Sequence, residues 1–262
     1  MLDRKVFYDT LRPKINLTTS NVVGMNKVLD YAEGRGSPTN DLAYILATAW
    51  WETGQTMQPV REAYWLSESW RKKNLRYYPY YGRGLVQTTW KANYATMAKV
   101  VGVDLVDKPD LLLKWEYSLP ALFIGMERGL YTGKKISNYI DSLDESDAED
   151  LREYTNARRI VNGTDKASTI GKLALNFEKA LKSGGYEPGV VSTVPAPIPP
   201  DLKPVPPAAP VKPTPAEVVG AGGVAVGAGV AAVQAGFDWW LVTLIAVAAA
   251  ITALIVIRAI KD

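Results

Sequence analysis

The chain has 262 residues and a formal net charge of +3, and it contains neither cysteine nor histidine. This composition excludes disulfides, zinc–thiolate sites, cysteine nucleophiles and Ser-His-Asp chemistry, so proton transfer falls to Asp, Glu, Lys or Tyr. The mild positive charge suits an anionic polymer as partner, but no run of Lys and Arg indicates nucleic-acid binding.

Residues 1–187 are predicted to form one mainly α-helical domain. The segment NDLAYILATAWWETG places Leu42, Ile45, Leu46 and Ala49 on one helix face. The segments NYATMAKVVGV and SLPALFIGMERGLY have the same spacing. DAEDLREYTNARRIVNG opens with acids and closes with Arg-Arg, the charge order that a helix dipole favours. KASTIGKLALNFEKALKSGG is expected to end the domain as a Gly-capped helix. Residues 77–90 could hold one or two short strands.

The remaining sequence predicts a tether. Residues 188–216 are rich in Pro and are expected to form an extended linker. They lead into a predicted membrane segment, 217–262, in which residues 239–257, WWLVTLIAVAAAITALIVI, are uncharged and long enough to cross a bilayer. The preceding stretch, 218–237, is either a second span or a flexible Gly/Ala linker. Its small-xxx-small glycine spacing would allow helix–helix association in the membrane.

Charged residues near the C-terminus help to predict how the chain would be oriented in the membrane. Arg258 and Lys261 favour a cytoplasmic C-terminus. The N-terminal sequence MLDRKVFYDTLRPKIN lacks the apolar stretch of a signal peptide. One span would place the N-terminal domain outside the cell, whereas a hairpin of two spans would keep both termini in the cytoplasm. The hairpin is therefore the preferred hypothesis.

Glu52 is the first candidate for acid/base chemistry. It is predicted to lie at the end of a helix over residues 41–53, near the negative end of the helix dipole and beside Trp50 and Trp51. Both the dipole and the partial desolvation raise the pKa of a carboxyl, which suits a general acid. The alternative is a capping or salt-bridged Glu, with Arg61 as a partner.

Glu62 is the second candidate. Arg61 stands beside it and would keep it ionised, and two carboxyls in different environments form the acid/base pair of glycoside hydrolysis. The alternative is a solvated surface residue, and Glu68 is a rival for the same role.

The segment YYPYYGRGLVQTTWKANY, residues 77–94, combines aromatic rings with hydrogen-bonding side chains. Its tyrosines can stack on sugar rings, or they can pack in the core. Gln87, Thr89 and Asn93 can hold hydroxyls, N-acetyl groups or a water molecule. The segment is therefore a candidate carbohydrate-binding surface.

Three motifs together resemble glycoside hydrolase family 19, the chitinase family. YYGRGLVQTTWKANY resembles the family signature, WWETG is similar to its His-Glu-Thr motif, and ARRIVNG is similar to its late Ile-Asn-Gly element. They occur in the family's order over residues 40–165. The sequence departs from the family in having Trp51 in place of the usual His, and Trp90 and Lys91 after the signature Thr. The short spacing between the glutamates, the missing cysteines and the membrane tail resemble the phage endolysin branch, whose members cut peptidoglycan.

The resemblance implies a mainly α, lysozyme-like helical domain with a cleft and an inverting mechanism without metal or cofactor. It makes Glu52 the general acid and Glu62 the base that activates water, while Thr89 helps to hold that water. The substrate-binding residues that it implies are Tyr81, Arg83, Gln87, Asn93 and Asn162.

These features predict a membrane-tethered peptidoglycan hydrolase for host cell lysis, located at the inner membrane of a bacterial host. Its partners would be peptidoglycan or a related N-acetyl amino-sugar polymer, and the lipid bilayer. One alternative is a chitinase acting on N-acetylglucosamine polymers. Another is a non-enzymatic, holin-like membrane protein with a degenerate sugar-binding head.

Overall fold

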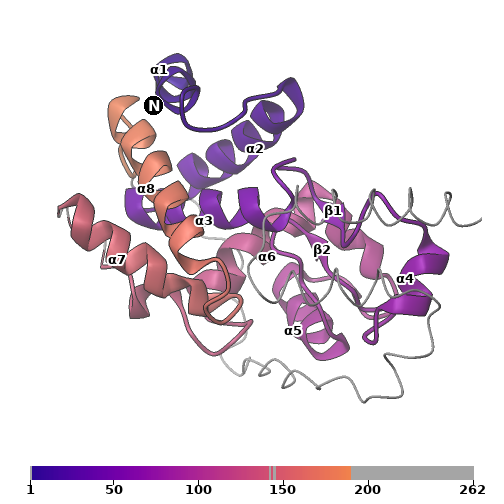
Figure 1. Cartoon of the computed structure of the whole chain (residues 1–262). Coiled ribbons are helices and arrows are strands. Elements are labelled where there is room, and N and C mark those ends of the chain that lie inside the picture. Colours follow the sequence, from indigo (N-terminus) through magenta and orange to yellow (C-terminus); the bar gives the residue numbers. More distant parts are fainter. Residues whose placement is uncertain (1, 142, 144–145, 190–262) are drawn as a thin grey trace, which may run out of the picture. The chain divides into compact units, whose positions relative to one another are not determined.

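The structure, a computed structural model, describes residues 2–141, 143 and 146–189 (Figure 1). Most of the predicted linker and the whole of the predicted membrane segment, with its possible spans 218–237 and 239–257, lie outside these residues. Within the described ranges, no helix is both long enough and apolar enough to cross a bilayer.

The described residues are mainly α-helical, as predicted. The α-helices are α1 Arg4–Leu11, α2 Thr19–Arg35, α3 Thr39–Glu52, α4 Glu68–Asn74, α5 Lys91–Val101, α6 Trp115–Glu127, α7 Asp147–Ala157 and α8 Ala167–Ser183. The 3₁₀ helices are η1 Pro109–Leu113, η2 Ile136–Asn138 and η3 Arg158–Ile160. The strands are β1 Val60–Arg61 and β2 Arg83–Gly84, which pair antiparallel with Arg61 opposite Arg83.

Local sequence accounts for several helix ends. Helix α2 begins with a capping box in which Thr18 and Asn21 bond to each other's backbone N–H, and it ends at Gly36 with φ of 64°. Helix α7 begins with a second capping box, between Ser146 and Glu149. The acidic start predicted for this helix is confirmed, but the helix ends at Ala157 and the Arg-Arg pair belongs to η3.

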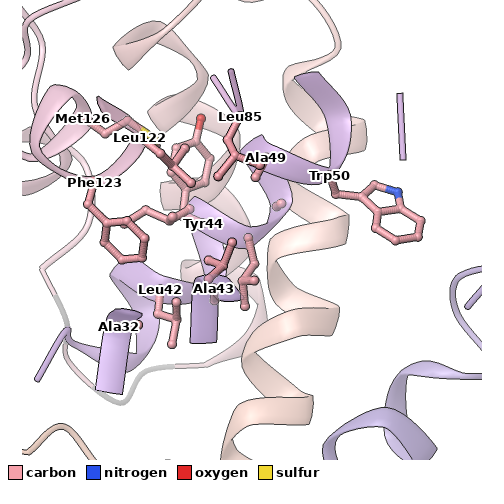
Figure 2. Close-up of a cluster of buried hydrophobic side chains, with 14 of the residues drawn as sticks. Ala32, Leu42, Ala43, Tyr44, Ala49, Trp50, Leu85, Leu122, Phe123 and Met126 are labelled. Atoms are coloured by element: carbon pink, nitrogen blue, oxygen red, sulfur yellow. The ribbon is translucent and has the colours of Figure 1, made fainter. Parts of the chain in front are cut away.

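Helix α3 lies at the centre of the core. The four residues predicted on its apolar face are buried, and the burial extends to every residue from Leu42 to Trp50. Helix α8 packs along α3, and α7 and α1 pack against α8 (Figure 1). On another side of α3, Tyr44 and Ala49 meet side chains of α6 such as Phe123 (Figure 2). A helix enclosed in this way holds its last residue, Glu52, in a fixed position.

The loop after α3 is held against α2. Gly24 lies so close to this loop that an added Cβ would be 1.9 Å from the carbonyl oxygen of Met57. Gln58 Nε2 also donates a hydrogen bond to the carbonyl oxygen of Ser20, at 2.8 Å. The loop leads directly into β1, a strand that the sequence pattern does not predict. The predicted strand within residues 77–90 is confirmed as β2.

Candidate active site

Glu52 is the last residue of α3, and it forms an ion pair with Arg158 of η3. Arg158 Nη1 donates a hydrogen bond to Glu52 Oε1 at 2.6 Å, with the two side chains 2% and 16% exposed respectively. Arg158 Nε donates to the carbonyl oxygen of Asp165 at 3.0 Å. The partner expected from the sequence, Arg61, instead pairs with Asp110 at 2.7 Å. Glu52 is therefore salt-bridged, but to Arg158 and not to the partner named from the sequence.

Burial raises the pKa of Glu52 above its ordinary value, and this is the largest effect. The charge of Arg158 and its hydrogen bond oppose that rise, while the negative charges of Asp165 and Glu62 add to it. The net direction is upward. Glu62 is thus near enough to Glu52 for its charge to favour the protonated form.

Glu62 directly follows β1 and is fixed through both carboxylate oxygens. Tyr77 Oη donates to Glu62 Oε1 at 2.6 Å, and the backbone N–H of Gly82 donates to Oε2 at 2.9 Å. The backbone N–H of Glu62 in turn donates to the carbonyl oxygen of Gly82 at 2.7 Å. These bonds orient the carboxylate without a cation, because Arg61 turns towards Asp110.

Asp110 of η1 stabilises the sheet that carries Glu62. Arg61 and Arg83 are direct cross-strand partners, an arrangement of like charges that destabilises a strand pair. Asp110 Oδ2 accepts a hydrogen bond from Arg61, and Oδ1 accepts one from Arg83, both at 2.7 Å. These two hydrogen bonds hold the pKa of Asp110 below its ordinary value despite partial burial.

The rival carboxylate, Glu68, lies at a different place. Tyr81 Oη donates to its two oxygens at 2.9 and 3.2 Å, and Arg71 Nε lies 3.3 Å from Oε2. Glu68 lines a cavity of about 690 Å³ together with Arg61 and Asp110. Its contacts are therefore with Tyr81 and Arg71, and its charge is not among those that raise the pKa of Glu52, whereas the charge of Glu62 is.

Three of the predicted polar residues form a chain of hydrogen bonds. Gln87, with φ of 55°, donates from Nε2 to the carbonyl oxygens of Val60 at 3.0 Å and Gly84 at 2.9 Å. Thr89 Oγ1 donates to the carbonyl oxygen of Gln87, and Asn93 Nδ2 donates to that of Thr89, each at 2.9 Å. Asn93 Oδ1 is buried and accepts no hydrogen bond from any described residue. The amide nitrogen of Gln87 thus holds β1 and β2 together.

Arg83 and Tyr81 pack inside the turn. The Arg83 guanidinium lies 3.7 Å from the centre of the Tyr81 ring, and its Nη1 donates to Pro79 O and Tyr94 Oη, both at 2.9 Å. Arg83 is 3% exposed and Tyr81 is 1% exposed. The ring of Tyr81 is thus buried against Arg83, and its expected role in substrate binding stays a prediction. Asn162 lies on an exposed turn after η3.

Sequence reasoning missed the roles of Arg158, Asp110 and Tyr77. Each acts on a residue far along the chain, and in the case of Glu52 and Arg158 the separation is 106 residues. Arg158 lies within the quoted motif ARRIVNG, which is the one sequence signal that marks it. Among the described residues, no group of three or more acidic side chains is arranged to hold a metal ion.

Comparison with known proteins finds similarity to chitinases over part of the chain. Residues 47–116 match the family model described as Chitinase class I, of glycoside hydrolase family 19. Endochitinase CH5B and a second endochitinase, both of Phaseolus vulgaris, are each 52% identical over 33 residues, which make up 13% of this chain and 10% of theirs. The chain thus spans about a tenth of the length of the curated relatives it matches.

Two solved structures are also similar in part. Chitinase C from Streptomyces griseus HUT6037 has a TM-score of 0.45 and 18% identity, covering 72% of this chain and 78% of that one. A bacterial family 19 chitinase has a TM-score of 0.39 and 20% identity, covering 72% of this chain and 97% of that one. The matched family segment, 47–116, contains Glu52, Glu62 and Thr89 but ends before Arg158. This match supports the prediction of a glycoside hydrolase.

Proposed function

We propose that this chain is a glycoside hydrolase that cleaves bonds between N-acetylated amino sugars by inverting acid/base catalysis. One observation carries the proposal. Glu52, whose pKa burial raises, lies within electrostatic reach of Glu62, a carboxylate oriented by Tyr77 and Gly82. Two carboxyls in such different surroundings are suited to opposite roles in proton transfer.

In this mechanism, Glu52 is the general acid. It donates its proton to the glycosidic oxygen as the bond to the anomeric carbon breaks. Glu52 then becomes a carboxylate, and Arg158, already 2.6 Å away, stabilises the charge that develops. The same ion pair that opposes the high pKa in the resting state therefore helps the proton to leave.

Glu62 is the base that removes a proton from the attacking water. The other O–H of that water can donate a hydrogen bond to Thr89 Oγ1, because the Thr89 hydroxyl uses its own hydrogen to bond the carbonyl oxygen of Gln87. Two acceptors would orient the water towards the anomeric carbon from the face opposite the leaving group. Asn93 supports this arrangement from behind, because its side-chain amide holds the carbonyl oxygen of Thr89.

The substrate that we propose is peptidoglycan, and the biological role is host cell lysis by a membrane-tethered endolysin. The Pro-rich linker and the uncharged stretch 239–257 support a tether to the inner membrane of a bacterial host. With a helical hairpin, the domain would remain in the cytoplasm until the membrane is breached. The alternative substrate is chitin, which the description of the matching family model favours.

A direct test incubates the purified full-length chain with purified peptidoglycan and with chitin hexamer. We expect turbidity to fall, mass spectrometry to show cleavage between amino sugars, and NMR to show first a product of inverted anomeric configuration. Glu52→Gln is the control and should lose about a hundredfold or more in rate. Retained configuration would contradict the inverting mechanism, and full activity of Glu52→Gln would contradict the assignment of the acid.

A further inference from the structure

A second cavity, of about 410 Å³, lies beside the C-terminal turn of α3. Its walls come from three segments that are far apart in the sequence: residues 14–16 between α1 and α2, the end of α3, and the first turns of α8. None of the residues assigned to acid/base chemistry above lines it. It is therefore a separate feature next to the candidate active site.

The charge of this cavity is entirely positive. Lys14 and Lys172 line it, and no Asp or Glu does. Within the described residues, no ion pair involves either lysine. By contrast, Lys179 and Lys182, further along α8, are paired with acids of α7 and α8. The two ammonium groups at the cavity are thus available for an anionic ligand.

The other walls combine indole rings with amides. Trp51 is half-buried, and the indole of Trp50 extends from α3 away from the side where Phe123 packs (Figure 2). Asn16, Gln55 and Asn176 also line the cavity, and no hydrogen bond among the described residues uses their side chains. Such amides recognise peptide or acetamido groups, while indole faces suit sugar rings or the apolar parts of a chain.

Several residues that line the cavity are close in sequence to Glu52 and to Asp165. Trp51 immediately precedes Glu52, and Gln55 follows three residues later. On the opposite wall, Ser168 comes three residues after Asp165, whose charge contributes to the raised pKa of Glu52. The cavity and Glu52 therefore share the C-terminal turn of α3.

We propose that this cavity binds the carboxylate-bearing peptide of a peptide-substituted amino-sugar polymer while the glycan backbone lies at Glu52 and Glu62. The inference rests on the proposed function and deepens it, because it assigns a site that distinguishes peptidoglycan from chitin. Chitin carries no carboxylate, so Lys14 and Lys172 would gain nothing from binding it. Exposed ammonium–carboxylate contacts are individually weak, so both lysines are needed for a clear preference.

The test compares the double variant Lys14→Gln/Lys172→Gln with the control Lys27→Gln/Lys99→Gln. The control removes the same charge from exposed lysines outside the cavity. The probes are soluble glycan fragments with their peptide stems, the same fragments with the stems removed, and chitin hexamer. Binding is followed by tryptophan fluorescence, and hydrolysis by kcat/KM.

We expect the cavity variant to bind stem-bearing fragments about tenfold more weakly than the control. We expect equal affinity of both variants for stem-free fragments and chitin hexamer, and salt to weaken only the stem-bearing complex. Equal losses in the two double variants, or equal wild-type affinity for fragments with and without stems, would overturn the inference. The fluorescence result does not depend on turnover, so a chain that hydrolyses neither polymer would contradict the proposed function without deciding the binding site.

Discussion

Replacing Arg158 by Met removes the charge that lies against Glu52 while keeping most of the side-chain volume. Removing one partner of a buried ion pair typically costs about 3–5 kcal/mol, because the other charge is left uncompensated. In this ion pair, the loss of stability depends on which of the two residues is replaced. After Arg158→Met, the Glu52 carboxyl can take up a proton and become neutral, whereas after Glu52→Leu the guanidinium stays charged. We therefore expect Arg158→Met to be the milder change at acidic pH.

The loss of stability in Arg158→Met should depend on pH in a defined direction. Arg158 lowers the pKa of Glu52, so its loss raises the folded-state pKa further above the unfolded value. Between these two values the folded chain holds a proton that the unfolded chain has released. The free energy of unfolding therefore falls as pH rises through that window, by up to about 1.4 kcal/mol per pH unit. The window of the variant extends higher than that of the wild type, so its deficit should grow from pH 5 to pH 8.

Urea unfolding at pH 5, 6, 7 and 8, followed by near-ultraviolet circular dichroism, measures this deficit. Arg159→Met is the matched control, because Arg159 is exposed and, among the described residues, its side chain donates hydrogen bonds to Asn156 of the preceding turn. We expect its deficit to be small and independent of pH. A pH-independent deficit for Arg158→Met as well, or one that shrinks towards pH 8, would refute the coupling between Arg158 and Glu52.

Three further predictions concern the groups around this pair. Glu62→Gln should lower kcat on peptidoglycan fragments by about a hundredfold or more, and an equal loss in Glu68→Gln would contradict the choice of base. Asp110→Asn should cost about 0.5–1 kcal/mol in urea unfolding, because it removes the charge that bridges the two arginines of the sheet but is 55% exposed to solvent, and wild-type stability would show that the bridge contributes nothing. Gly24→Ala should lower stability by at least about 1–3 kcal/mol, because the new Cβ would lie 1.9 Å from the Met57 carbonyl oxygen. An unchanged Tm for Gly24→Ala would show that the loop moves aside freely.

The spacing of apolar residues predicted where helices form, but it did not predict which other elements pack around each helix. The apolar residues of α3 have helical spacing, and a helix forms there. However, spacing along one segment cannot indicate how many other elements surround it, and α6 and α8 cover sides of α3 that include Tyr44 and Thr48. The strand β1 was missed for a related reason. Two residues, Val60 and Arg61, are too few to show alternation, and their pairing depends on β2 more than twenty residues later.

In the candidate site, the local sequence likewise did not predict which charged residues pair with each other. The position of Glu52 at a helix end beside two tryptophans predicted the direction of its pKa shift, because those features are local. Its partner was not predictable in this way, since the nearest cation in the sequence is Arg61 and the one in space is Arg158. The burial of Tyr81 could not be predicted either, because aromatic residues that bind sugars and those that fill a turn have the same composition, and only packing distinguishes them.

The most direct test of Glu52 and Glu62 as acid and base is a measurement of the pKa of the Glu52 carboxyl itself. Glutamate labelled with ¹³C at the carboxyl carbon allows each Glu to be titrated by NMR, and the signal missing from Glu52→Gln identifies the one of interest. We expect the titration midpoint of Glu52 to lie above the ordinary value of about 4.3 for Glu. We also expect this midpoint to fall in Glu62→Gln, because a neighbouring negative charge has been removed. A Glu52 midpoint at or below the ordinary value, unmoved by the change at position 62, would contradict the assignment of these two residues as acid and base.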